Sequence, residues 1–204
     1  MKPTTKFILL LGSVLMIAVV ICACATKSYI DVTYRLPAAA QDFQGKRVFL
    51  DCRDMRPDKT IFGEKTKAEF KHFTGLFSLS VNQGEKPFVA GAFDLPSLFK
   101  EAFSRRLANL GIDVITRQDQ STPGIEIIIK NFRLNLVDRK WVANIMYEAR
   151  LLKEDRLLAE QTISGDAERI KAFGIGDAEK VLGDIFSDSV NRLNVRKLFE
   201  QALP

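Results

Sequence analysis

Histidine and cysteine, the residue types that most often bind metals or act as nucleophiles, are scarce in this sequence. One histidine, His72, and three cysteines, Cys22, Cys24 and Cys52, occur among 204 residues. A structural zinc site needs four such ligands, and a disulfide framework needs an even set of cysteines at spread positions. We therefore expect no metal centre, no other cofactor and no disulfide scaffold.

Catalytic signatures are also missing. The sequence contains no Gly-x-Ser-x-Gly, no phosphate loop and no His-Glu-x-x-His. The stretch GIGDAEK at 174–180 lacks the third glycine and the βαβ setting of a dinucleotide site. The spacing of Asp51, Asp54 and Asp58 does not single out a glycosidase pair. We predict no catalytic residues and a non-enzymatic protein, with a hydrolase that uses His72 and carboxylates as an alternative.

Acidic residues are absent from the first 23 positions, and no charge of either sign occurs from Phe7 to Ala25. Lys2 and Lys6 precede this apolar run, and small residues follow it. That order is typical of a secretory signal peptide. A membrane-spanning helix needs roughly 20 apolar residues, a length that the run barely reaches. We predict a signal peptide over 1–23 and keep an uncleaved anchor helix as the alternative.

The end of the apolar run, Ile21-Cys22-Ala23-Cys24, resembles the lipobox of bacterial lipoprotein signal peptides. The resemblance implies cleavage between Ala23 and Cys24, a diacylglycerol on the Cys24 thiol, and acylation, typically with palmitate, of the new amine. The next residue is Ala25 rather than Asp. By resemblance to the sorting rule of enteric-type bacteria, this favours the outer membrane, with the protein facing the periplasm.

Beyond the signal peptide the charge is nearly balanced. Without residues 1–23 the chain carries 28 Lys and Arg against 25 Asp and Glu. Nucleic-acid-binding domains are usually far more basic, so we expect no nucleic acid as a partner.

Residues 24–44 are predicted to be the lipidated cysteine and a tether. Ala38, Ala39 and Ala40 are small, and Pro37 interrupts strand pairing. About 20 extended residues reach roughly 66 Å at most, which would let a domain stand away from the lipid. Within the tether, alternating apolar residues at 30, 32 and 34 are compatible with a short strand.

Residues 45–204 are predicted to form a single periplasmic domain. Val48, Leu50 and Cys52 share one face of a strand, so Cys52 is expected to be a small buried hydrophobe. Residues 64–75 are polar and basic and are expected to be a solvated loop.

The clearest helix covers 94–111. Asp94 can cap it, Pro96 suits its first turn and Gly111 can end it. Strands are expected at about 124–138, 140–153 and 156–166, with a bulge near 130–131 where the apolar phase slips. A second helix is expected over about 177–202. The fold class is therefore α+β, a mostly antiparallel sheet with two helices packed on one face.

The layout resembles the YajG-like family of bacterial outer-membrane lipoproteins. The features that carry the resemblance are the lipobox ending at Cys24, YRLP (34–37), RDMRP (53–57) with its Asp-x-Arg turn, LFKEAFSRRLANLGIDV (98–114) and DAEKVLGDIFSDSVNRL (177–193). The resemblance implies an envelope protein with no catalytic residues to transfer. We therefore expect a lipid-anchored lipoprotein with a non-enzymatic binding or structural domain, whose partners are the membrane and a protein of the envelope. The alternative is an auxiliary lipoprotein subunit of a transport or peptidoglycan-synthesis complex.

Overall fold

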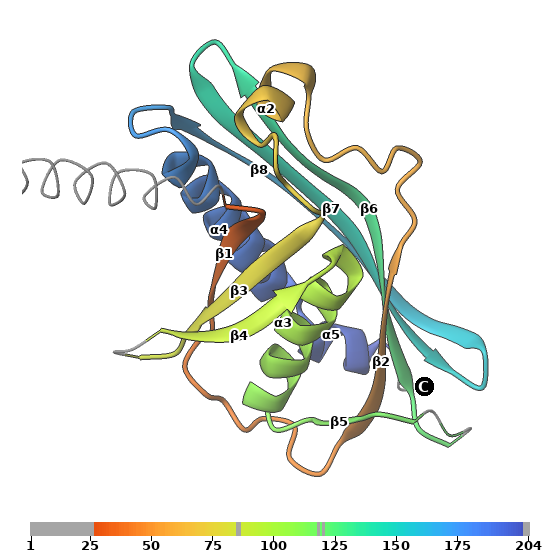
Figure 1. Cartoon of the computed structure of the whole chain (residues 1–204). Coiled ribbons are helices and arrows are strands. Elements are labelled where there is room, and N and C mark those ends of the chain that lie inside the picture. The colour runs from red at the N-terminus through yellow and green to blue at the C-terminus, as the bar shows by residue number, and fades with distance from the viewer. Residues whose placement is uncertain (1–26, 85–86, 118, 120, 202–204) are drawn as a thin grey trace, which may run out of the picture.

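The computed structural model describes residues 27–84, 87–117, 119 and 121–201, so the predicted signal peptide, Ala23 and Cys24 lie outside the described residues. No helix in this described part is long and apolar enough to cross a bilayer. Figure 1 shows the arrangement of the elements. In chain order they are β1 (Tyr29–Arg35), β2 (Arg47–Asp54), α2 (Glu64–Glu69), β3 (Leu76–Asn82), β4 (Phe88–Phe93), α3 (Leu95–Asn109), β5 (Asp113–Ile115), β6 (Gly124–Val137), β7 (Lys140–Lys153), β8 (Arg156–Ile170), α4 (Ile175–Arg192) and α5 (Val195–Glu200).

The fold is α+β, as predicted, but the strands form two mixed sheets rather than one mostly antiparallel sheet. The smaller sheet has the order β1-β3-β4 and the larger has the order β5-β2-β6-β7-β8. β1 pairs in parallel with β3, and β2 lies in parallel between β5 and β6. Alternation in a sequence shows which face of a strand is buried but not which strand lies beside it. That is why the direction of pairing was predicted wrongly.

The three long strands of the larger sheet agree with the prediction. β6, β7 and β8 are antiparallel neighbours, and the register shifts between Ile129 and Asn131. This bulge accounts for the slip in apolar phase, since Ile127 and Ile129 are buried before it and Phe132 after it. The turn between β6 and β7 has positive φ at both Asp138 and Arg139, which matches the twist of a two-residue hairpin.

Helix α3 begins as its sequence indicates. The Asp94 side chain accepts a hydrogen bond from the Ser97 amide at 3.0 Å, which satisfies one of the free amides of the first turn. Its apolar stripe is buried against the larger sheet, where Phe103 lies edge-on to Tyr147 of β7.

Helix α4 packs on the same face of the larger sheet. The hydroxyl of Tyr147 donates to the Ser189 carbonyl of α4 at 2.8 Å, and Phe186 of α4 lies edge-on to Phe99 of α3. The core therefore lies between this sheet face, the two long helices and the smaller sheet. The second helix was predicted to continue to about residue 202, but it ends at Arg192 and α5 begins a new helix. The Asn194 side chain caps α5 by accepting from the Lys197 amide at 2.9 Å.

Strand β1 falls inside the segment that was predicted to be a tether. Ile30, Val32 and Tyr34 are fully buried, and the whole strand pairs with β3. Beyond it, the Phe43 amide donates to the Leu110 carbonyl at 3.1 Å. The domain therefore begins before residue 45. A tether that ends at Tyr29 spans at most about 18 Å from Cys24, rather than 66 Å.

The segment 64–75 is only partly the solvated loop that was predicted. It contains α2, and the buried Thr66 hydroxyl accepts from the Leu136 amide at 2.7 Å. Phe70 stacks on Phe62 at 4.9 Å between ring centroids. Phe70 lies edge-on to Trp141 of β7, and Phe73 lies edge-on to Phe77 of β3, while the lysines of the segment are exposed.

Candidate functional site

The residues that sequence analysis considered for chemistry do not come together in the described part of the chain. His72 is exposed on the segment before β3. Cys52 is buried in β2, where burial, together with the neighbouring Asp51, raises the pKa of its thiol far above the ordinary value. A protonated thiol is a poor nucleophile. Among the described residues there is no group of three or more His, Cys, Asp or Glu that could hold a metal.

The Asp-x-Arg turn at the end of β2 contains an ion pair between Asp54 and the buried Arg56. Arg56 is 6% exposed, and its guanidinium donates to Asp54 Oδ2 at 2.9 Å and to the Phe132 carbonyl at 3.1 Å. Burial alone would raise the pKa of Asp54, but the hydrogen bonds from Arg56 and Lys59 outweigh it and lower the pKa to about 2. This pair ties the end of β2 to β6 and has a structural role.

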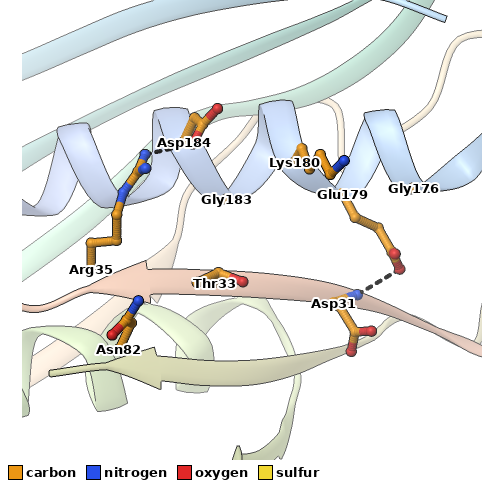
Figure 2. Close-up of a pocket in the computed structure, with 9 residues that line it drawn as sticks. All are labelled: Asp31, Thr33, Arg35, Asn82, Gly176, Glu179, Lys180, Gly183 and Asp184. Carbon is orange, nitrogen blue, oxygen red and sulfur yellow. Dashed lines mark hydrogen bonds and ion pairs between the residues drawn. The ribbon is translucent and has the colours of Figure 1, made fainter. Parts of the chain in front are cut away.

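A groove of about 420 Å³, lined mostly by polar residues, lies between α4 and the smaller sheet. Figure 2 shows its residues, with Arg35 and Asp184 at one end and Asp31 and Glu179 at the other. The complete lining is Asp31, Thr33, Arg35, Asn82, Gly176, Glu179, Lys180, Gly183 and Asp184.

The groove exists because α4 covers the free edge of β1. An edge strand has amides and carbonyls with no neighbouring strand to bind. Side chains of α4 take that place: Glu179 accepts from the Asp31 amide at 2.9 Å, Ser187 accepts from the Arg35 amide at 3.0 Å, and Ser187 donates to the Thr33 carbonyl at 2.9 Å. The edge of β1 is therefore closed to further strands.

Close contact between α4 and β1 depends on Gly183. A Cβ atom at this position would lie 3.1 Å from both the amide nitrogen and the carbonyl oxygen of Thr33. Gly176, two turns earlier on α4, has nothing within 4 Å of such an atom. The helix therefore touches the strand at the middle of the groove and stands clear of it at the end.

Ion pairs join α4 to β1 and to the residue Lys27, which lies just before β1. Arg35 pairs with Asp184 at 2.5 Å, and Lys27 pairs with Glu179 at 2.5 Å. Burial alone would lower the pKa of Lys27, but its hydrogen bonds to Asp31 and Glu179 outweigh it, so the pKa is raised. The lining includes neither His nor Cys. The groove is suited to polar recognition or to holding the N-terminal strand in place.

Sequence analysis did not identify this groove, although the residue patterns of β1 and of α4 each indicate one of its two walls. On β1 the lining residues Asp31, Thr33 and Arg35 alternate with the buried ones, so they are the outward face that the same pattern defines. On α4 the lining positions 176, 179, 180, 183 and 184 recur every three or four residues, which places them on one helical face. What the sequence did not show was that these two faces meet.

No protein-family model matches the chain, and no curated protein matches it. Solved structures do. A Xanthomonas campestris protein described as a member of family DUF330 is 12% identical with a TM-score of 0.51, over 84% of this chain and 94% of that one. An uncharacterised protein is 11% identical with a TM-score of 0.47, over 84% and 98%. A minor lipoprotein of Acinetobacter baumannii is 8% identical with a TM-score of 0.36, over 79% and 96%.

The match to the Xanthomonas protein shows that the two chains share a fold. At this level of identity a common fold says nothing about a common activity. Membership of the YajG-like family stays a prediction.

Proposed function

We propose that this protein is a bacterial cell-envelope lipoprotein, held at the outer membrane by lipid on Cys24, with a periplasmic domain that binds or supports and does not catalyse. The observation that carries the proposal is the position of Cys24. It ends the lipobox-like sequence, and the folded domain begins with β1 only five residues later. The first strand fills its share of the core with Ile30, Val32 and Tyr34, which leaves Cys24 ahead of the domain for modification.

The non-enzymatic part of the proposal is supported by where reactive groups lie. The Cys52 thiol is buried and its pKa is raised by that burial. His72 is exposed and is not among the residues that line the groove. Asp54 is held by Arg56 and Lys59 in a structural turn. The groove itself is lined by charged residues of both signs and by neither His nor Cys.

The experiment compares two cysteine variants of the full-length chain in cells. Cys24→Ser should abolish processing and leave the precursor at full length, because serine lacks the thiol that accepts the lipid. Cys22→Ser is the matched control and should be processed and lipidated like the wild type. Electrophoretic mobility and mass spectrometry of the N-terminal peptide give the readout. If Cys24→Ser is still cleaved and still attached to the membrane, the proposal is wrong. Density-gradient separation of the two membranes tests the outer-membrane placement.

A second candidate, an auxiliary subunit of an envelope complex, is favoured by the other edge of the smaller sheet. β4 is the outer strand of that sheet, and Phe88 and Val89 on it are 44% and 69% exposed. The edge of β1 is covered by α4, whereas β4 presents apolar side chains at an edge that a partner strand can extend. A photo-crosslinker at Val89 should capture an envelope protein in cells, whereas one at Leu157 should not. No difference between the two positions would count against this candidate.

A further inference from the structure

The short chain between Cys24 and the domain fixes which end of the molecule lies nearest the lipid. Cys24 and Lys27 are three positions apart in the sequence, so their Cα atoms are at most about 11 Å apart. Lys27 is already part of the folded structure, with its Nζ atom 2.5 Å from Glu179 Oε1. Glu179 lies four residues after the start of α4, or about 6 Å along the helix. A lipid on Cys24 would therefore enter the bilayer close to the first turn of α4.

The surface around this turn carries large exposed apolar side chains. Phe173, just before α4, is 85% exposed, and Ile170 at the end of β8 is 65% exposed. Ile175 and Val137 are 37% and 49% exposed. Figure 1 shows the turn between β6 and β7, α2, and the segment between β8 and α4 gathered at one end of the molecule. A cluster of exposed apolar residues of this kind marks an interaction surface.

Phe173 is exposed on a segment that is firmly held. The Asp177 carboxylate accepts from the amides of Phe173 and Ala172 at 2.5 and 2.8 Å. The indole of Trp141 donates to the Gly174 carbonyl at 3.1 Å. The backbone on either side of Phe173 is therefore fixed by hydrogen bonds, and these hold the ring outward.

Cations lie beside the apolar residues. Lys65, Arg139 and Lys171 line a hollow of about 490 Å³ together with the single carboxylate of Asp138. The Lys171 ammonium pairs with Glu69 Oε1 at 2.7 Å. The Lys171 amide donates to the Arg139 carbonyl at 2.9 Å, which joins the segments that carry Arg139 and Lys171. Apolar side chains next to Lys and Arg are the usual composition of a surface that lies on a bilayer, where cations meet the headgroup phosphates.

We propose that this surface, called the anchor end and made up of Phe173, Ile170, Ile175 and Val137 with Lys65, Arg139 and Lys171, lies on the lipid bilayer. The apolar side chains enter the boundary between headgroups and acyl chains, and Lys65 and Arg139 face the phosphates of anionic phospholipids. This inference rests on the lipid attachment at Cys24 proposed above. It adds an orientation, in which α4 and β1 start at the membrane and the turn between β7 and β8 points away from it.

The test places one tryptophan just beyond the end of β8 and another near the start of that strand. Phe173→Trp reports on the anchor end, and Leu157→Trp is the matched control, because Leu157 is 54% exposed at the opposite end of β8. Residues 157 and 170 are 13 positions apart along β8, or roughly 40 Å. The full-length lipidated variants are reconstituted into vesicles of phosphatidylethanolamine and phosphatidylglycerol in which part of the lipid is brominated. The native Trp141 is fully buried, and its signal is subtracted with the unsubstituted protein.

The expected result is strong quenching of Phe173→Trp by brominated lipid and almost none of Leu157→Trp, in protein that floats with the vesicles. Equal quenching of the two variants in floating protein would overturn the orientation and leave the anchor standing. Protein that carries no acyl group by mass spectrometry and does not float would instead overturn the proposed function. If Phe173→Trp is quenched in vesicles of lipid alone but not in vesicles that also hold a second envelope protein, the surface belongs to that protein. This result would also overturn the proposal.

A second arm tests the charges. Arg139→Glu in the Phe173→Trp background should reduce quenching in vesicles that contain phosphatidylglycerol, and Arg156→Glu at the far end of β8 should leave it unchanged. With phosphatidylethanolamine alone, Arg139→Glu should make little difference, because zwitterionic lipid gives no net attraction. If both arginine variants behave alike with the anionic lipid, the cations have no part in the contact.

Discussion

At the scale of single residues, the Asp-x-Arg turn shows how a short sequence pattern becomes a constraint on the core. Arg56 is a buried cation, and burial of a charge is unfavourable unless partners compensate it. Asp54 supplies the opposite charge, and the Phe132 carbonyl accepts a further hydrogen bond. The sequence shows the Asp-x-Arg spacing, but the partner on β6 is 76 residues away along the chain. No local pattern could have predicted it.

Asp54→Asn is expected to lower the free energy of unfolding by about 2 to 3 kcal/mol at neutral pH. The variant keeps the shape of the side chain but leaves the buried guanidinium without its counter-charge. Urea unfolding of the mature protein, followed by circular dichroism, gives the difference. Asp113→Asn is the control, since Asp113 makes only an exposed pair with Arg47 at 3.5 Å, and it should change the free energy by less than about 0.5 kcal/mol.

The stabilising effect of the Asp54 carboxylate is also expected to depend on pH. The folded-state pKa of Asp54 is about 2, below the value of about 4 in an unfolded chain. The ionised carboxylate therefore favours the folded state above about pH 4, and this contribution is lost as pH falls toward 2. The gap in unfolding free energy between the wild type and Asp54→Asn should narrow from pH 5 to pH 2. A gap that stays constant over this range would contradict the assignment.

At the scale of elements, α4 occupies the position beside β1 that a further strand of the sheet would otherwise take. Its side chains bind the backbone of the strand edge at residues 31, 33 and 35. This contact needs a glycine where the helix comes nearest, and the surrounding hydrogen bonds leave Thr33 little room to move. A helix that replaces a strand in this way protects the edge from pairing with another chain.

Two glycine substitutions on α4 test this contact. Gly183→Ala is expected to destabilise the protein by about 1 kcal/mol, because overpacking against the Thr33 backbone exceeds the gain in helix propensity. Gly176→Ala has open space around its Cβ and should stabilise the protein by about 0.5 kcal/mol. Both values come from urea unfolding midpoints measured side by side. If both substitutions change the free energy of unfolding in the same direction, α4 does not press on β1 at Gly183.

The elements that the sequence predicted well are those whose signal is local. The cap at Asp94, the stripe of α3 and the bulge near Asn131 all follow from spacing within one segment. β4 was not predicted, because in FVAGAF the apolar residues do not alternate. The division into two sheets was also missed. It depends on β1 pairing with β3 across more than 40 residues, and long-range pairing leaves no local trace in a single sequence.

At the scale of the whole molecule, the start of β1 sets the length of chain between the domain and the proposed lipid attachment at Cys24. The predicted tether of 24–44 would have given the domain freedom of orientation, whereas the structure ends it at Tyr29. With the proposed lipid on Cys24, such a short connection would limit the domain to orientations in which the start of α4 is near the bilayer. The location at the envelope is an inference from the sequence around Cys24, but the orientation could only come from the structure.

Lengthening the connection should loosen this orientation. Ten Gly and Ser residues inserted between Thr26 and Lys27 add a flexible chain with an average span of roughly 17 Å. The protein should still float with vesicles, because Cys24 is unchanged, but quenching of Phe173→Trp by brominated lipid should fall as the domain rotates away. The same insertion between Glu154 and Asp155, in the turn between β7 and β8, is the control and should leave quenching unchanged. If quenching survives the longer connection, the anchor end binds lipid by its own apolar and basic side chains, and the tether length is not what orients the domain.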